Sequence, residues 1–208
     1  MERNRQRHGR QGEDQRMTAS LEEEMAAHFA MNAEMRARLP DIIAIADAIW
    51  QSVCAGGCVY VFGNGGSAAE ALHFSGELIG RYKSNRRPLP ATCLSADVSA
   101  LTCIGNDFSF DAVFARQVTA LAGPRDIVIA FSTSGRSENI RSGIAAAWAK
   151  GAKTVLFTGQ NGAEIAKDCS LAFISPHTMT ARIQEMHQLA MHLICARLET
   201  LVAESENV

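Results

Sequence analysis

The feature that most constrains the fold is a repeated alternation of short apolar runs with longer segments of helical periodicity. The apolar runs are rich in β-branched and aromatic residues and lie at residues 58–62, 91–95, 126–131, 154–158 and 171–175. Helical patterns follow three of them, at 67–80, 137–150 and 180–203. Continuous apolar runs are typical of parallel strands that helices cover on both faces. The sequence therefore predicts an α/β fold, a three-layer αβα sandwich with a central, mostly parallel five-stranded sheet.

Two further helical patterns precede the first apolar run. Ser20 and Glu23 form a capping box that predicts a helix start, and Pro40 interrupts this helix. The second pattern has apolar residues at helical spacing, namely Ile42, Ile45, Ile49 and Val53. We expect one domain over residues 18–208, with an N-terminal helical arm at 18–56 and an αβα core at 57–208. Residues 1–17 have little to bury and are predicted to form a disordered N-terminal extension.

Composition excludes several classes of protein. With 47% hydrophobic and 20% charged residues, the chain is neither mainly disordered nor collagen-like. Its 20 basic and 22 acidic residues lack the basic excess that is typical of nucleic-acid binders. No apolar run is long enough to span a membrane, the N-terminus has no secretory signal, and the cysteines form no CxxC pair. We therefore expect a cytoplasmic protein with reduced thiols, without a membrane or nucleic-acid partner.

A glycine-rich segment, GNGGS at residues 63–67, directly follows the first apolar run. Glycines let the backbone approach a ligand closely, and free N–H groups at a helix start attract anions. An ordinary tight turn is the alternative. Gly63, Gly65 and Ala68 also match a dinucleotide-binding fingerprint, which requires an acidic residue about 20 positions later. Asp97 follows Ala68 by 29 positions, so this match is poor.

A second segment, STSGRS at residues 132–137, follows the third apolar run and precedes a helical pattern. Four hydroxyl side chains, a glycine and a helix start are typical of a cradle for a monophosphate. A serine-rich helix cap, the alternative, accounts for only one hydroxyl. Ligands of open α/β sheets bind at the carboxyl ends of the strands, where both segments are expected to lie. The two segments together therefore predict a phosphorylated ligand.

Two of the predicted helices carry side chains with acid–base or metal-binding chemistry. His73 and Glu77 are four residues apart and share one helix face, and Gln184 and His192 share a broad side of the last helix. Two histidines and a glutamate form a zinc-type ligand set, to which a glutamine would add an oxygen. Equally, a glutamate and a histidine that face each other across a sugar form a base/acid pair. A purely structural role is the third possibility.

The first and last helical patterns are apolar on more than one side. The last pattern has Ile183, Met186, Leu189, Met191, Leu193, Ile194 and Leu198, and the first has Met25, Phe29, Met31 and Met35. A single sheet covers only one side of a helix, so helices from other subunits are expected to cover the rest. The sequence therefore predicts a homo-oligomer.

Four longer segments combine these features: FGNGGSAAEALHFSGELIGRY, SALTCIGNDFSFDAVFARQV, AFSTSGRSENI and TARIQEMHQLAMHLI. Together they resemble the sugar isomerase (SIS) domain family and, within it, the phosphoheptose isomerases. The similarity covers about residues 20–203. It implies the flavodoxin-like SIS sandwich, one zinc ion per subunit, and a homotetramer whose active sites lie between subunits.

The resemblance also assigns residues. Glu77 and His192 would be the catalytic acid/base positions, and the metal would be held by His73, Glu77, Gln184 and His192. The phosphosugar would be bound by Asn64, Gly65, Gly66, Ser67, Glu77, Asn106, Asp107, Ser132, Thr133, Ser134, Ser137 and Gln184. One departure is Ala181, where some family members have an aspartate, which puts any proton-transfer role of that position in question.

The implied activity is the conversion of D-sedoheptulose 7-phosphate to D-glycero-D-manno-heptose 7-phosphate by enediol(ate) proton transfer. This is the first step of nucleotide-activated heptose biosynthesis, which supplies products such as lipopolysaccharide. The alternative is a non-catalytic SIS domain that serves as a phosphosugar-binding regulator or binds a replication initiator. A relative of that kind lacks the carboxylate at the position of Glu77. This chain has it, which favours the enzyme.

Overall fold

The computed structural model describes residues 2–206, and the side chains of residues 17–206 apart from Asn32. The chain divides into two compact units, residues 1–37 and 38–208. The first consists of helix α1 (Glu2–Met35) and most of the 3-10 turn η1 (Arg36–Arg38). Helix α1 passes through Ser20 without a break, so the helix start predicted there is wrong. The helix also covers residues 2–17, where the sequence predicts disorder, and the predicted domain boundaries stay a prediction.

The second unit is built on a five-stranded sheet with the order β2-β1-β3-β4-β5, in which every neighbouring pair is parallel. The strands are β1 (Val59–Gly63), β2 (Ala91–Cys93), β3 (Ile127–Ser132), β4 (Lys153–Gly159) and β5 (Leu171–Ser175). Each coincides with one of the five predicted runs to within two residues. The predicted α/β fold is therefore confirmed, with a sheet that is wholly parallel.

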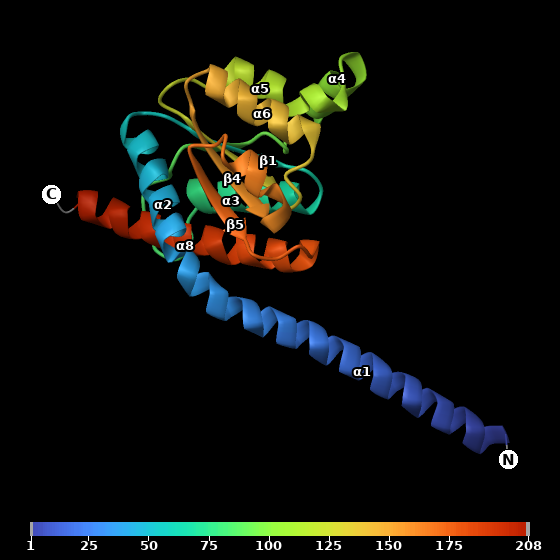
Figure 1. Cartoon of the computed structure of the whole chain (residues 1–208). Helices are drawn as coiled ribbons and strands as arrows, with labels where there is room; N and C mark the ends of the chain where they lie inside the picture. The colour runs from blue at the N-terminus through green and yellow to red at the C-terminus, as the bar shows by residue number, and fades with distance from the viewer. Residues whose placement is uncertain (1, 207–208) are drawn as a thin grey trace. The chain divides into compact units, whose positions relative to one another are not determined.

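Helices cover both faces of this sheet, as Figure 1 shows. One face carries α2 (Leu39–Cys54), α3 (Gly66–Ile79) and α8 (Thr180–Glu206). The other carries α5 (Val113–Leu121), α6 (Glu138–Ala149) and the short α7 (Ala163–Ala166). Helix α4 (Val98–Asp107) precedes α5, and the 3-10 turns η2 (Phe110–Ala112) and η3 (Gln160–Gly162) complete the unit. Because all five strands are parallel, their carboxyl ends lie along one edge of the sheet.

Aromatic clusters on both faces of the sheet hold the strands in place. On the face of α5 and α6, the rings of Phe62 and Phe114 stack with centroids 4.6 Å apart. On the opposite face, Phe131 stacks on Phe157 at 4.6 Å and meets Phe74 of α3 edge-on at 6.4 Å. Each fully buried phenylalanine contributes about 1.5–3 kcal/mol to folding. The loops at the strand ends therefore start from a well-packed, rigid sheet.

The six cysteines lie in environments that differ in exposure. All six are free, and Cys93 and Cys195 are buried, whereas Cys54 and Cys103 are exposed. Burial raises the pKa of the Cys195 thiol to about 12, which makes it unreactive. Within the described part of the chain, no helix has both the length and the apolar character that crossing a membrane requires.

Candidate functional site

The two predicted anion-binding segments lie side by side. They follow the adjacent strands β1 and β3, in which Gly63 pairs with Phe131. In the strand order, β2 lies on the far side of β1 and β4 on the far side of β3. The chain direction across the sheet thus reverses between β1 and β3. Such a switch point is where open α/β sheets form their ligand crevice, at the carboxyl ends of the strands.

The first segment, residues 63–67, is anchored at its start and open at its tip. The Gly63 N–H donates to Ser95 Oγ at 3.1 Å, and this hydroxyl donates back to the Gly63 carbonyl at 2.9 Å. Gly65 has a φ of +55°, which favours glycine, and apart from its chain neighbours no described residue has an atom within 4 Å of the position that a Cβ would occupy there. The segment therefore presents bare backbone toward open space at the start of α3.

A reciprocal pair of side-chain amides joins the first segment to the helix that follows the second. Asn64 Nδ2 donates to Asn139 Oδ1 and Asn139 Nδ2 donates to Asn64 Oδ1, both at 2.9 Å. Asn139 lies in the first turn of α6 and is buried. The pair spans 75 positions of sequence. It holds the two anion-binding segments at a fixed separation.

The second segment, residues 132–137, has a constrained backbone. Ser132 Oγ accepts the N–H of Gly135 at 3.2 Å, and Ser134 Oγ accepts the N–H of Arg136 at the same distance. Gly135 has a φ of +63°, and a Cβ there would lie 2.6 Å from the Gly162 Cα, so only glycine fits. Ser137 is the N-cap of α6, but its hydroxyl makes no capping hydrogen bond. The hydroxyl groups and the helix start are thus held together, as an anion cradle requires.

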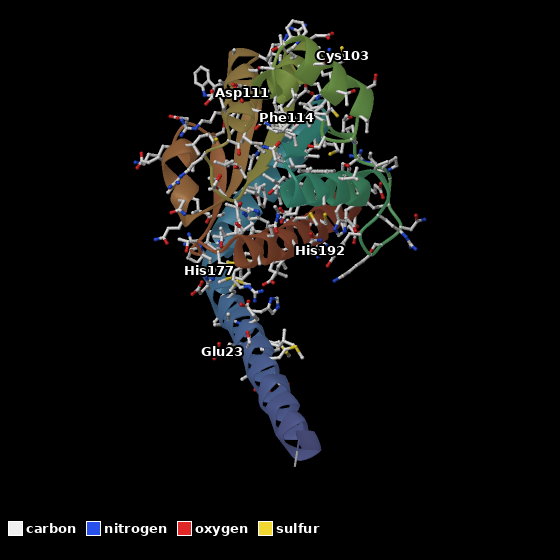
Figure 2. The ribbon with its side chains drawn as sticks, turned by 90° about the vertical axis from the view of Figure 1, so that its right-hand side faces the viewer. Glu23, Cys103, Asp111, Phe114, His177 and His192 are labelled. Carbon is white, nitrogen blue, oxygen red and sulfur yellow. The ribbon has the colours of Figure 1, made fainter. Side chains whose placement is uncertain are left out.

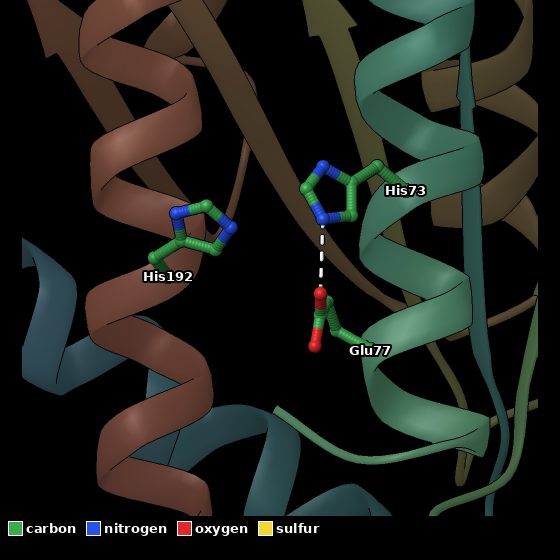
Figure 3. A group of neighbouring side chains, drawn as sticks. All are labelled: His73, Glu77 and His192. Atoms are coloured by element: carbon green, nitrogen blue, oxygen red, sulfur yellow. Dashed lines mark hydrogen bonds and ion pairs between the residues drawn. The ribbon is translucent and has the colours of Figure 1, made fainter. Parts of the chain in front are cut away.

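A second group of polar side chains lies between α3 and α8. One ligand atom from each of His73, Glu77 and His192 lies within 4.8 Å of the others. Figure 3 shows His73 and Glu77 on α3 and His192 facing them from α8. His73 Nε2 donates to Glu77 Oε1 at 2.9 Å. The other carboxylate oxygen, Glu77 Oε2, is buried and has no hydrogen-bond partner among the described residues. The structure therefore brings together three of the four predicted metal positions.

Gln188, rather than Gln184, contacts this group. Gln188 Nε2 donates to His73 Nδ1 at 2.6 Å and lies 3.4 Å from His192 Nε2. The sequence analysis missed this residue, although its position four residues before His192 was a signal that both share one helix face. The Gln184 amide instead occupies the space that a Cβ on Gly66 would fill. Gln184 thus lies at the first anion-binding segment.

The surroundings of His192 favour its neutral form. Burial and the nearby His73 lower the pKa of the imidazole, with a smaller contribution from Lys83, while Glu77 opposes them. The Tyr82 ring stacks on the imidazole with centroids 5.3 Å apart and an interplanar angle of 20°. A neutral imidazole has one donor and one acceptor nitrogen, as proton transfer or metal binding requires.

Two predicted substrate-binding residues lie elsewhere in this chain. Asn106 and Asp107 end α4, are exposed, and share a hydrogen bond of 2.8 Å from the Asn106 amide to the Asp107 carboxylate. Figure 2 shows Cys103, on the same helix, far from His192 within the second unit. The structure does not bring these residues to the His73–Glu77–His192 group of the same chain.

The dinucleotide interpretation finds no support at Asp97. Strand β2 ends at Cys93, and Asp97 is the N-cap of α4, where its carboxylate accepts the Ala100 N–H at 2.9 Å. The carboxylate therefore stabilises a helix start, whereas a ribose would need it at the end of the second strand.

Comparison with known proteins agrees with this geometry. A family model described as SIS domain matches residues 26–159. The phosphoheptose isomerase of Aquifex aeolicus is 46% identical over 163 residues, which are 78% of this chain and 85% of that protein. The chain belongs to the SIS domain family. Another relative within this SIS domain family, the phosphoheptose isomerase of Solidesulfovibrio magneticus, is 45% identical over 190 residues, 91% of this chain and 92% of that protein.

Solved structures give the same result for the fold. The phosphoheptose isomerase of Neisseria gonorrhoeae superposes with a TM-score of 0.79 at 37% sequence identity. The match covers 86% of this SIS-domain chain and 99% of that chain. The resemblance to phosphoheptose isomerases and the predicted SIS fold are therefore confirmed.

Proposed function

We propose that this SIS-domain protein is a phosphoheptose isomerase that converts D-sedoheptulose 7-phosphate to D-glycero-D-manno-heptose 7-phosphate. One observation carries the proposal: the first anion-binding segment lies at the start of α3 beside the first turns of α8, and the glutamate–histidine group lies about two to three turns further along the same two helices. Glu77 follows Gly66 by 11 residues of α3, about 16 Å along the axis. On α8, Gln184 contacts Gly66 and Gln188 contacts His73. Helices α3 and α8 thus run side by side from the cradle to the His73–Glu77–His192 group, and we call the surface between these two points the track.

A phosphosugar fits this track with its phosphate in the cradle and its carbonyl end toward Glu77. The cradle supplies the N–H groups of two helix starts and the hydroxyl groups of residues 132–137, which suit a doubly charged phosphate. Gln184 lies at the phosphate end of the track. This position supports its predicted role in substrate binding better than its predicted role as a metal ligand.

The reaction that the group supports is proton transfer between adjacent carbons. The Glu77 carboxylate takes a proton from C1 of the ketose, and the electron pair forms the double bond of an enediol(ate) as the C2 carbonyl oxygen gains a proton. Glu77 then returns its proton to C2, while the C1 hydroxyl loses its proton and becomes the aldehyde. Without a metal, His192, held neutral, carries the hydroxyl proton between the two oxygens; with zinc bound, its single acceptor nitrogen would hold the metal instead. Acid/base groups of this kind contribute about 10²–10⁴-fold each.

We also propose that His73, Glu77 and His192 hold one zinc ion. Nitrogen, oxygen and nitrogen are a donor set that zinc prefers, and the buried Glu77 Oε2 lacks a hydrogen-bond partner within the described residues. Zinc, when bound, polarises the two sugar oxygens and stabilises the developing negative charge. Glu77 has two oxygens, so one can bind a metal while the other accepts a proton.

We propose a homotetramer with active sites between subunits. Helix α1 exposes apolar side chains four residues apart, at Met17, Leu21, Met25 and Phe29, each 58–65% exposed. Helix α8 supports the proposal less than expected, because its own chain already buries Ile183, Met186, Met191, Ile194 and Leu198. Sites between subunits would also give Asn106 and Asp107 a place beside a substrate. The cytoplasmic location and the heptose pathway stay predictions.

The proposed function is tested by incubating the purified protein with sedoheptulose 7-phosphate and following the products by NMR. The proposal expects an aldoheptose 7-phosphate to form, and expects sedoheptulose without the phosphate to react far more slowly, because the cradle holds only the phosphate. A chelator should lower the rate and added zinc should restore it. Binding of the phosphosugar without any turnover would contradict the enzyme and favour the non-catalytic regulator.

A further inference from the structure

The loop between α3 and β2 is tied to both helices of the His73–Glu77–His192 group. We call its residues 80–88 the strap. Arg86, near the β2 end of the strap, contacts α3 through its side chain: Nη2 donates to the Glu77 carbonyl at 2.7 Å and Nη1 donates to the Leu78 carbonyl at 2.8 Å. The guanidinium thereby satisfies carbonyl groups in the last turn of α3, which have no partner within the helix. The strap is thus fixed next to Glu77.

A single carboxylate ties the strap to α8. Glu199 Oε1 accepts three consecutive backbone N–H groups, those of Tyr82 at 3.1 Å, Lys83 at 2.8 Å and Ser84 at 3.0 Å. These hydrogen bonds and the Arg86 charge lower the pKa of Glu199 against the opposing effect of burial. Glu199 follows His192 by seven residues, about two helical turns. Hydrogen bonds to a charged acceptor are about twice as strong as neutral ones.

The tied segment carries the ring that covers His192. Tyr82 stacks on the imidazole at 5.3 Å, and Lys83 Nζ lies 4.8 Å from the centre of the Tyr82 ring. Without a neighbour on its face, a half-exposed histidine on a helix has several staggered rotamers available. A stacked ring removes most of this freedom, because the imidazole cannot turn without losing the contact.

We propose that Tyr82 is a positioning residue for His192, and that Glu199 acts through Tyr82 by fixing the strap. The inference rests on the proposed function for its kinetic consequence, but not for its structural one. A carboxylate that accepts three N–H groups determines where the Tyr82 ring lies. The ring in turn determines where the imidazole points relative to His73 and Glu77. A displacement of about 1 Å at a reacting group can cost about 100-fold in rate.

The test uses five variants of the full chain: Tyr82→Ala, Tyr82→Phe, Glu199→Ala, the double variant Tyr82→Ala/Glu199→Ala, and Thr200→Ala as the matched control. Thr200 is the exposed neighbour of Glu199, and within the described part of the chain its hydroxyl donates to the Ala196 carbonyl in the preceding turn of α8. The first measurement is the NMR spectrum of the imidazole groups in protein whose histidines are isotope-labelled, recorded without substrate. The signals of His192 should move in Tyr82→Ala and Glu199→Ala, because ring stacking is lost, and should stay in Tyr82→Phe and Thr200→Ala.

The second measurement is kcat and KM for sedoheptulose 7-phosphate. We expect kcat to fall about 10- to 100-fold in Tyr82→Ala and Glu199→Ala with little change in KM, and to stay near wild type in Tyr82→Phe. The double variant should be no slower than the slower single variant, since both act on one imidazole. The proposal would be overturned if the kcat losses of the two single variants multiplied in the double variant, or if the His192 signal did not move in Glu199→Ala. It would also be overturned if Tyr82→Phe lost as much activity as Tyr82→Ala. An inactive wild type would contradict the proposed function alone, because the NMR result still decides the role of the strap.

Discussion

Glu70 on α3 and His187 on α8 form a buried pair whose replacement tests how the two helices are held together. Glu70 Oε2 lies 3.7 Å from His187 Nδ1, and the imidazole is fully buried while the carboxylate is 7% exposed. Among the described residues, none hydrogen-bonds to the polar atoms of either side chain. The imidazole is surrounded by three rings at 5.7–6.0 Å, those of Phe131, Phe157 and Phe173. Each partner is thus the main polar neighbour of the other.

The expected loss depends on whether one partner or both are replaced. His187→Leu leaves a buried carboxylate without its partner, which should cost about 3–5 kcal/mol of unfolding free energy. Glu70→Met leaves a buried imidazole without the carboxylate beside it, which should cost about 1–3 kcal/mol. The double variant leaves only apolar groups. It should equal the wild type or exceed its stability by about 1–4 kcal/mol, because a packed apolar pair avoids the desolvation of both groups.

The assay is urea unfolding at one fixed protein concentration, with equal m-values required for the comparison. A matched control is the exposed pair of Glu164 and Lys167, which are 2.7 Å apart. Its replacement by Glu164→Met should change stability by less than about 1 kcal/mol. A double variant whose loss equals the sum of the two single losses would refute the reasoning, because the two side chains would then not interact.

Three further predictions concern the cradle, the pH dependence and the metal. Gly135→Ala should lower the free energy of unfolding by at least about 1–2 kcal/mol and raise KM, because its Cβ would meet the Gly162 backbone. Gly76→Ala, the control, has open space and should not destabilise the protein. Equal unfolding midpoints for the two variants would contradict this prediction. Lys83→Gln removes a charge that lowers the pKa of His192, so the acid limb of kcat/KM should move to higher pH, and an unchanged limb would refute the assignment. Zinc should raise the Tm of the chelator-treated wild type but not that of His73→Ala, and an equal rise in both would exclude the proposed ligands.

The sheet could be predicted because its strands are buried on both faces. Residues 127–131, for example, are apolar at every position, which no amphipathic surface helix requires. Helix α4 was missed for the opposite reason. Its apolar residues Val98, Leu101 and Ile104 recur at helical spacing over one short stretch only, and α4 buries just Ile104 while Val98 is 69% exposed. A charged helix such as the start of α1 likewise has no apolar face from which to predict it.

The sequence could predict only those relationships within the site that join residues of the same helix. The four-residue spacing of His73 and Glu77 fixes their shared face. That His192 joins them depends on how α3 and α8 pack, which the resemblance implied and spacing alone did not show. Gln188 was overlooked in favour of Gln184, since nothing in the sequence tells which turn of α8 lies opposite His73. The stacking of Tyr82 has no sequence signal at all, because a loop sets it.

The most direct test of the catalytic role of Glu77 is the reaction of wild type and Glu77→Gln with sedoheptulose 7-phosphate in D2O. Wild type should form the aldose with deuterium at C2, because the proton on the carboxylate exchanges with solvent. Glu77→Gln should bind the phosphosugar with similar affinity through the cradle, yet lose product formation and exchange by at least about 10²–10⁴-fold. Product formed by Glu77→Gln at nearly the wild-type rate would contradict carboxylate-mediated proton transfer.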